Sequence, residues 1–390
     1  MATAAQQGVA RAVRERLLAP GPVTADELAA AIDAVPDPAP AEGAGVVVDT
    51  AHDTGLLGAT STKLEVTVRL RMAHIPTSVC HLFDPVTHPL LSCRAAKALG
   101  ADATTRRLRV TATVEGYSAP AIDTVELETA APHEFDLLPT FYPERLRDVT
   151  ELTRATVSVL VDDLDSQLVE LHRTSPVWLL ARTTALLSVM DPVTGASQDL
   201  TPYFGAFVTP NDPSVLGFLQ RVNAHHPDKT LAGYQGDHDG VTAQVRAVYD
   251  AVRADVDVTY VNSTLAFSPD DTTSVQRVRL PHETLDTGAA NCIDGVVLLA
   301  SLLEAISLRP AIVVVPGHAF LGWETWRDSG EWRYLETTML GTHPFEAAAA
   351  RGDEEAAELQ KLATDRNDQT IFRRWPLRQL RKDFGIVPTA

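Results

Sequence analysis

The amino-acid sequence predicts an α+β protein in which a β-rich region precedes a region of helices and antiparallel strands. From about 46 to 190, apolar and polar residues alternate with a period of two, as in KLEVTVRLRM and RATVSVLVDDL. This alternation is typical of half-buried strands. From about 200 onward helical spacing returns, as in VTAQVRAVYDAVRADV (241–256). The two periods therefore indicate two differently built parts.

Five segments follow one another along the 390 residues. Residues 1–34 are predicted to form a small helical segment, because VTADELAAAIDAV opens with a capping-box pattern. Residues 35–45, rich in Pro, Ala and Gly, are predicted to form a linker. Short strands between turn signals over 46–190 predict an antiparallel, Ig-like β-sandwich. Residues 200–345 form a second domain, and 346–390 add a helix and a basic tail packed on it.

The composition narrows the class of protein and its partners. The chain has 33 Lys and Arg against 51 Asp and Glu, a net charge of −18, which disfavours general binding to nucleic acid or anionic membranes. The longest apolar runs, such as 296–303, are shorter than the ~20 residues that span a bilayer. No charged-then-apolar leader opens the chain, and three cysteines are too few for a disulfide scaffold. We expect a soluble, cytoplasmic protein.

One cysteine, Cys292 in GAANCIDGVVLLASLL, lies where a loop meets an apolar helix pattern. The thiolate is the nucleophilic form, and a free cysteine, with a pKa near ~8.5, needs help to ionise at neutral pH. A helix N-terminus provides such help, and its N–H groups also suit an oxyanion hole. The alternative is a buried core residue, because cysteine is among the residue types most often buried.

A histidine and an acid follow Cys292 in the order that thiol catalysis needs. His318 comes after a Pro-Gly pair and begins the apolar strand HAFLGW, so its ring can face the helix N-terminus. Two acids compete to orient this ring. Glu324 lies ~20 Å away along the same strand, whereas Glu336 lies on the returning strand. A hairpin centred on Arg327 places Glu336 opposite His318, and a turn centred on Ser329 shifts that pairing by about four residues.

The segments NCIDGVVLLASLL, LRPAIVVVPGHAFLGWE and EWRYLETT together resemble the transglutaminase-like cysteine hydrolase fold. Its pattern is a cysteine that starts a helix, a strand, a Gly-His that opens the next strand, and an acid followed by Thr on the strand after that. The resemblance covers about 235–345 and implies a papain/transglutaminase-like catalytic domain. By this resemblance Cys292 is the nucleophile, His318 the general base, and Glu336 holds the position usually filled by Asp.

Three further residues are candidates for supporting roles. The family usually has Gly near the position of Asn291, which is here a polar neighbour of the oxyanion site or a loop residue. Asp294 matches an acid often found two residues after the cysteine, with a structural or capping role. Gln235, in YQGDHDG, would be an oxyanion donor like the glutamine of papain-like enzymes, or part of a polar turn before the next helix.

These residues predict a cysteine hydrolase, a protease that cleaves peptide or isopeptide bonds through a Cys292 thioester. If an amine resolves the thioester, the same site is a transglutaminase, and an amidase belongs to the same class. The rival hypothesis is an inactive binding or scaffold protein with this fold. No metal or organic cofactor is implied. The substrate would be a protein or peptide, and the N-terminal helices or the β-sandwich would dock a protein partner.

Two other groups of residues have simpler interpretations. Cys80 and Cys93 have His81 and His88 nearby, but their spacing is poor for a Cys₂His₂ zinc site, so we expect core or surface thiols. The cationic stretch 373–382 is expected to be a solvated helix face whose charges pair with acids of the same protein.

Overall fold

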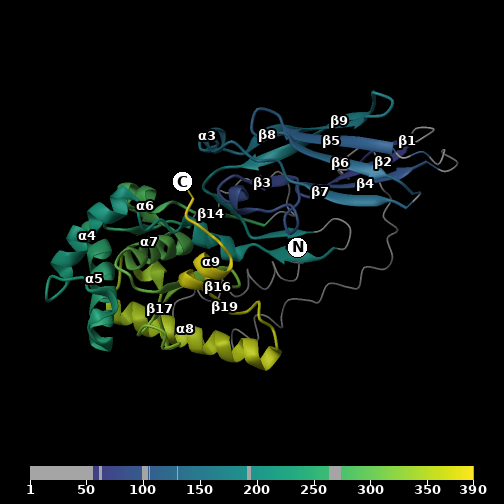
Figure 1. Ribbon diagram of the computed structural model, residues 1–390. Helices are drawn as coiled ribbons and strands as arrows, with labels where there is room; N and C mark the ends of the chain where they lie inside the picture. The colour runs from purple at the N-terminus through teal and green to yellow at the C-terminus, as the bar shows by residue number, and fades with distance from the viewer. Residues whose placement is uncertain are drawn as a thin grey trace. The chain divides into compact units, whose positions relative to one another are not determined.

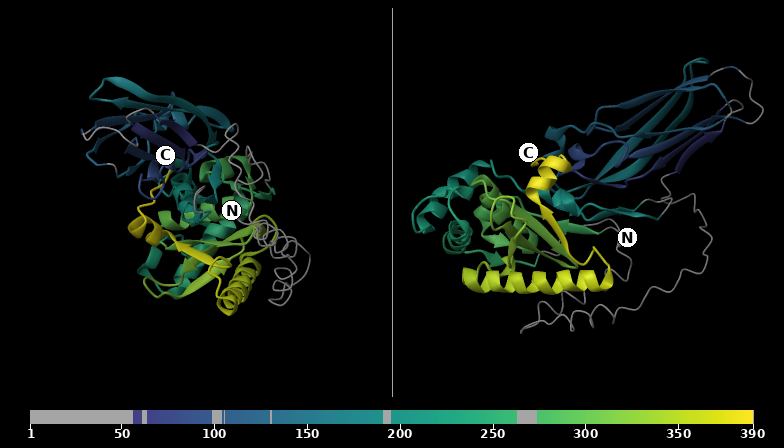
Figure 2. Two further views of the ribbon diagram at one scale, coloured as in Figure 1. Left: turned by 90° about the vertical axis from the view of Figure 1, so that its right-hand side faces the viewer. Right: turned by 60° about the horizontal axis from the view of Figure 1, so that its bottom comes forward.

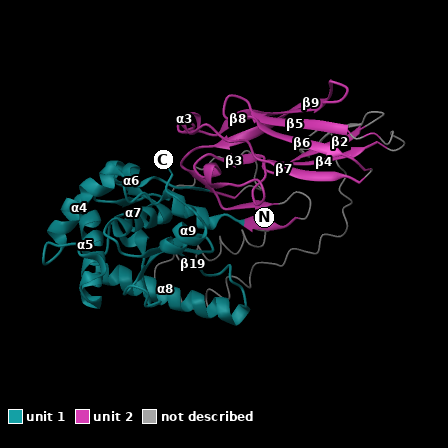
Figure 3. Cartoon of the chain, viewed as in Figure 1, with its two compact units in different colours: residues 1–40, 199–266, 276–390 teal, residues 41–198, 267–275 magenta. Residues whose placement is uncertain are grey.

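The structure is a computed structural model of the chain, and the two compact units into which it divides are coloured separately in Figure 3. The described residues are 56–60, 64–98, 104, 106–129, 131–190, 195–262 and 274–389. Unit 1 comprises 1–40, 199–266 and 276–390, and unit 2 comprises 41–198 and 267–275. The helical segment predicted over 1–34 and the linker predicted over 35–45 lie outside the described residues.

Most strands of unit 2 belong to two sheets, visible as two layers in Figure 1. The first sheet has the order β1 (Leu56–Thr60), β2 (Leu64–Leu70), β4 (Leu91–Lys97), β7 (His133–Leu137). The second has the order β3 (His74–Pro76), β9 (Leu168–Leu180), β8 (Thr153–Asp163), β5 (Arg106–Val114), β6 (Ala121–Leu127). Shorter elements are η1 (Cys80–Leu82), α3 (Pro143–Leu146), β10 (Thr184–Leu186), β11 (Ser188–Met190) and β12 (Ser197–Asp199).

The alternation in the sequence explains these strands. Every second residue of β2 is buried, from Leu64 to Leu70, and β8 repeats this from Ala155 to Val161. A strand that alternates in this way covers a core with one face only. The prediction of strands in this region is confirmed. One pairing departs from the antiparallel expectation, because β3 pairs with β9 in parallel.

Unit 1 mixes helices with a four-stranded antiparallel sheet of order β18-β17-β16-β19. Its strands are β16 (Pro310–Val315), β17 (His318–Glu324), β18 (Trp332–Leu335) and β19 (Arg373–Pro376), with short β13 (Thr259–Tyr260), β14 (Val275–Arg277) and β15 (Ala289–Ala290). Its α-helices are α4 (Pro213–His225), α5 (His238–Asp255), α6 (Pro281–Thr287), α7 (Cys292–Ala305), α8 (Phe345–Arg366) and α9 (Leu377–Asp383). Its 3-10 turns are η2 (Thr201–Phe207), η3 (Gly233–Gln235) and η4 (Thr337–Met339).

Helices cover both faces of this sheet, with α7 on one side and α8 along the other (Figures 1 and 2). Helix α7 is buried all round from Ile293 to Leu303, as its unbroken apolar sequence requires. Leu359 and Leu362 of α8 pack against Phe320 and Tyr334 of the sheet. The architecture is therefore α+β. Among the described helices, none combines the length and the apolar character needed to cross a membrane.

The cationic stretch 373–382 differs from the prediction of a helix face. Its first four residues form β19, which pairs with β16 as an edge strand of the sheet. Helix α9 begins only at Leu377. The expected pairing with acids of the same protein is confirmed. Arg373 lies 3.3 Å from Asp199, and Arg381 lies 3.0 Å from Glu304.

Candidate active site

Cys292 is the first residue of α7, as the sequence predicts. The preceding residue, Asn291, is the N-cap, and its Oδ1 accepts a hydrogen bond of 2.9 Å from the N–H of Asp294. In return, Asp294 Oδ2 accepts the N–H of Asn291 at 2.9 Å, which completes a capping box. The thiol of Cys292 is free and half-buried. The start of α7 is thus held by its neighbours, and Cys292 at this position is only partly buried.

The side chains of Asp294 and Asn291 both form hydrogen bonds at this helix start. Asp294 is fully buried, and it accepts hydrogen bonds from the backbone N–H and the guanidinium of Arg279, both at 2.7 Å. Burial raises the pKa of Asp294, and these hydrogen bonds oppose that rise. The Nδ2 of Asn291 donates to the carbonyl of Arg277 at 3.0 Å. The backbone N–H and the side-chain amide of Asn291 thus both have partners within the protein, and Asp294 has the capping position that the sequence predicts.

The backbone N–H groups of Cys292 and Ile293, unlike that of Asp294, are not bonded by the cap. The first N–H groups of an α-helix lack an intrahelical acceptor, and the cap takes only the one of Asp294. Within the part of the chain that the structure describes, no acceptor is paired with the N–H of Cys292 or Ile293. Two donors at the positive end of a helix beside a thiol suit the oxygen of a carbonyl under attack.

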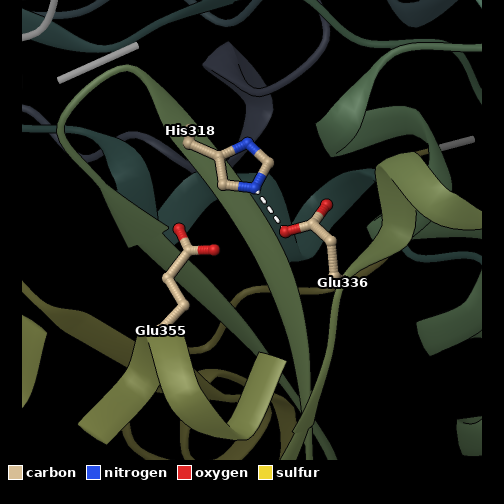
Figure 4. Close-up of side chains that lie close together, drawn as sticks. All are labelled: His318, Glu336 and Glu355. Carbon is tan, nitrogen blue, oxygen red and sulfur yellow. Dashed lines mark hydrogen bonds and ion pairs between the residues drawn. The ribbon is translucent and has the colours of Figure 1, made fainter. Parts of the chain in front are cut away.

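His318 opens β17 immediately after a two-residue turn. Gly317 in that turn has a φ of 75°, a left-handed conformation that favours glycine. The side chain of His318 is 13% exposed, and its Nε2 lies 2.8 Å from Oε2 of Glu336 (Figure 4). This contact leaves Nδ1 as the ring nitrogen that can serve the thiol of Cys292, and the nearness of that thiol helps to raise the pKa of His318.

The hairpin register differs from the predicted one. Leu321 pairs with Leu335 and Glu324 with Trp332, so the turn is centred on Asp328 rather than on Arg327 or Ser329. Continuing this register by one step places Glu336 opposite Phe320, not opposite His318 as predicted. Glu336 therefore reaches His318 diagonally. The competing acid, Glu324, pairs with Arg309 at 3.0 Å at the far end of β17.

Glu336 is held in place by the 3-10 turn η4 that follows it. It is 4% exposed, and its Oε1 accepts hydrogen bonds from the N–H and the hydroxyl of Thr338, at 2.8 Å and 2.6 Å. Thr337 donates its hydroxyl to the carbonyl of Cys292 at 2.9 Å. Because Gly295 has no side chain, η4 can lie against α7, where an added Cβ would be 3.0 Å from Thr337. Cys292 and Glu336 are thus linked through one short turn.

The electrostatics of the site favour an imidazolium. Burial lowers the pKa of His318, but the attraction of Glu336 and hydrogen bonds with Cys292 and Glu336 outweigh burial and hold this pKa well above its usual value of 6.5. Burial also opposes the ionisation of Glu336, yet His318 and Thr338 bring the pKa of Glu336 below its usual value of 4.5. At neutral pH the pair is therefore an imidazolium and a carboxylate.

A second carboxyl group, that of Glu355, faces the same imidazole from α8 (Figure 4). Glu355 is 1% exposed, and its pKa is raised to about 7, chiefly by burial. Glu355 is not among the site residues predicted from the sequence. A signal was present, because Glu355 lies at helical spacing with the buried residues Gly352 and Leu359, so that its side chain falls on the inner face of the helix.

These three groups are also the described side chains best placed to hold a cation. Single ligand atoms of His318, Glu336 and Glu355 lie within 4.8 Å of one another. However, Nε2 of His318 and both oxygens of Glu336 already have hydrogen-bond partners within the protein. The arrangement is thus satisfied as an ion pair, and we assign no metal to it.

Gln235 does not join the site, which corrects the prediction of an oxyanion donor. The hydroxyl of its neighbour Tyr234 donates to the carbonyl of Glu324 at 2.9 Å and accepts the N–H of Arg309 at 3.1 Å. Both partners lie beyond the C-terminal end of α7 or at the far end of β17. Helix α7, with 14 residues, is about 20 Å long, so this end is far from Cys292. The side chain of Gln235 is exposed there.

The site joins a half-buried thiol, an imidazole hydrogen-bonded to a buried carboxylate, and two N–H groups at a helix start. No family model matches the chain, and a search of curated proteins finds no match. The chemistry open to this arrangement follows from its groups. A thiol beside a base that is itself oriented by an acid can attack an electrophilic carbonyl carbon.

Proposed function

We propose that the chain is a transglutaminase-like cysteine hydrolase that cleaves peptide or isopeptide bonds. The observation that carries the proposal is the pair of His318 and Glu336, 2.8 Å apart, beside Cys292 at the N-terminus of α7. Each member has the environment that its role needs. The thiol is accessible, the imidazole is held by a carboxylate, and that carboxylate is buried and hydrogen-bonded by Thr338.

In the proposed reaction, His318 is an imidazolium because its Nδ1 has already taken the proton of the Cys292 thiol, and the thiolate sulfur attacks the substrate carbonyl carbon. A C–S bond forms, and the carbonyl oxygen takes up negative charge near the N–H groups of Cys292 and Ile293. His318 then returns the proton to the leaving amine nitrogen as the C–N bond breaks, which leaves a thioester. Water, deprotonated by His318, attacks the thioester and releases a carboxylic acid while the sulfur recovers its proton.

The role of Glu336 follows from its contact with Nε2. A carboxylate at this nitrogen fixes the ring tautomer and stabilises the imidazolium formed during each half of the reaction. The same groups support acyl transfer when an amine, rather than water, attacks the thioester. They would also be present in a scaffold protein without turnover, so the reactivity of the thiol decides between an enzyme and a scaffold.

Alkylation of the thiols by iodoacetamide tests this reactivity. The thiolate is the form that reacts, so the labelling rate at a fixed neutral pH reports how strongly the surroundings activate the sulfur. We expect Cys292 to be labelled at least about tenfold faster than Cys80 and Cys93, because the imidazolium of His318 stabilises negative charge on the sulfur. In His318→Ala the rate at neutral pH should fall at least about tenfold. Peptide mapping by mass spectrometry assigns each adduct.

The other two cysteines are internal controls. Burial raises the pKa of Cys80 and of Cys93 to about 12, so both should label very slowly. Cleavage of a peptide library by wild type and by Cys292→Ala then tests turnover, with added primary amine to reveal acyl transfer. Labelling of Cys292 at the same rate in wild type and His318→Ala would contradict an activated thiol. Equal cleavage by wild type and Cys292→Ala would place the activity elsewhere.

A further inference from the structure

Helix α8 places Glu355 beside the proposed catalytic histidine, on the sheet face that α8 covers. Its carboxyl, the ring of His318 and the carboxyl of Glu336 have ligand atoms within 4.8 Å of one another (Figure 4). Two carboxyl groups thus face one imidazole. An acid at such a depth is uncommon, because burial of a charge in an apolar surrounding is costly unless it is paired.

The two acids differ in the hydrogen-bond partners of their carboxyl oxygens. Both oxygens of Glu336 accept hydrogen bonds, from His318 and Thr338. Glu355 has a single ion pair, in which Oε2 lies 3.6 Å from Arg351, and its buried Oε1 has no hydrogen-bond partner among the described residues. Glu336 therefore serves as the permanent carboxylate of the site, and Glu355 is the acid whose charge can change.

Close packing of α8 against β18 fixes the backbone position of Glu355 near the ring of His318. Gly352, one turn before Glu355, lies so close to β18 that an added Cβ would be 2.6 Å from the backbone nitrogen of Leu335. Asp353 anchors the same turn, because its carboxylate accepts the N–H of Tyr334 at 2.8 Å and pairs with Arg333 at 2.8 Å. The position of Glu355 next to His318 is thus built into the packing of the helix.

We propose that Glu355 is a positioning residue of this site, which acts through His318 and extends the pH range over which the imidazole keeps its proton. The inference rests on the proposed function of Cys292 and His318 for its catalytic meaning. The charged and titratable groups that face Glu355 are His318 from β17, Glu336 before η4, and Arg351 and Glu358 from α8 itself.

The sign of the effect follows from these neighbours. The pKa of Glu355 is raised to about 7, chiefly by burial, so the carboxyl is largely neutral in mildly acidic solution and becomes negative above neutrality. His318 loses its proton at higher pH, where Glu355 is ionised. A negative charge within ~4–6 Å then raises the pKa of the imidazole by about one pH unit or more. Glu355 thereby preserves the imidazolium in alkaline solution.

Titration of His318 by nuclear magnetic resonance tests this directly and does not require catalysis. In Glu355→Gln, a nearly isosteric change, we expect the midpoint of the His318 titration to fall by about one pH unit. In wild type the ring signals should also show a small inflection near pH 7 from Glu355, absent in the variant. The control is Glu354→Gln, on the outer side of the same turn, where the side chain is 52% exposed and pairs with Arg351. Its midpoint should match wild type.

A second measurement on the wild-type protein keeps the test independent of how Glu355→Gln folds. Carbon-13 labelling of the glutamate carboxyl groups should show one buried carboxyl that titrates near pH 7. An unchanged His318 midpoint in Glu355→Gln, the same change in Glu354→Gln, or no such carboxyl in wild type would each overturn the inference. If iodoacetamide labelling refutes the activated thiol while these titrations behave as expected, the proposed function fails and the coupling between Glu355 and His318 stands.

Discussion

Oε2 of Glu336 lies 2.8 Å from Nε2 of His318 although the two residues are not direct partners across the hairpin. Leu321 pairs with Leu335, so the next step of the ladder sets Glu336 opposite Phe320, two residues beyond His318. Diagonal neighbours in an antiparallel pair are ~7–8 Å apart, a gap that only long or aromatic side chains cross. The family that the sequence resembles usually has aspartate at this position. Glutamate is longer by one methylene, which matches the diagonal contact.

Shortening Glu336 should therefore be nearly as harmful as removing it. We expect Glu336→Asp and Glu336→Ala each to lower the rate of iodoacetamide labelling at Cys292, at neutral pH, by about tenfold or more, because neither can hold Nε2 of His318. The matched control is Glu324→Asp, at the far end of β17, which removes a methylene from the pair with Arg309. Its labelling rate should equal that of wild type. Full reactivity in Glu336→Asp would refute the diagonal contact.

The local pattern of the sequence predicted much of unit 1. A polar residue before an apolar run indicates a helix start, and α7 begins at Cys292 with Asn291 as its cap. The Pro-Gly pair between two apolar runs predicted the turn between β16 and β17. These features depend on nearest neighbours along the chain, for which propensity and turn chemistry are informative.

Features that depend on distant partners were not predictable in the same way. The turn between β17 and β18 contains Asp328 with a φ of 59° and Gly330 with a φ of 69°. The sequence of this segment is compatible with several turns, so it did not determine the pairing register of the two strands. Strand β19 exists because β16 offers it a free edge. Helical spacing places Glu355 on the inner face of α8, but its position beside His318 depends on how α8 crosses the sheet and was not predicted.

Replacing glycine by alanine should have opposite effects on stability in α8, which packs closely on the sheet, and in α4, where the added Cβ meets no other atom. Gly352→Ala should lower the free energy of unfolding by about 1–3 kcal/mol, because the new Cβ would lie 2.6 Å from the backbone nitrogen of Leu335. Gly217→Ala, in α4, meets no atom within 4 Å and should raise that free energy by about 0.5–1 kcal/mol through helix propensity. Urea unfolding measures both. Stabilisation by Gly352→Ala would mean that α8 does not pack this tightly.

The cap of α7 should also be measurable. Asn291→Ala removes the acceptor for the N–H of Asp294 and the donor to the carbonyl of Arg277, so we expect a loss of about 1–2 kcal/mol in the free energy of unfolding. Asn291→Ser retains a capping oxygen and should lose less. Thermal and urea unfolding of the two variants provide the comparison. Equal losses would show that the cap does not stabilise the helix.

The ion pair of His318 and Glu336 predicts a bell-shaped contribution to stability. The folded-state pKa of His318 is raised above 6.5, so its contribution is full below pH 6.5 and is lost as the pH rises through that raised pKa. The folded-state pKa of Glu336 is lowered, so its contribution is full above pH 4.5 and is lost as the pH falls through that lowered pKa. Both contributions are complete between about pH 4.5 and pH 6.5.

Glu336→Gln should therefore destabilise the protein most in this window. We expect a loss of about 3 kcal/mol in the free energy of unfolding near pH 6, since removing one partner leaves a buried charge unpaired. The loss should shrink in strong acid, where Glu336 is protonated, and in strong alkali, where His318 is neutral. Urea unfolding of wild type and variant at acid, neutral and alkaline pH gives the profile. A loss that is the same at every pH would mean that the two side chains do not form an ion pair in the folded protein.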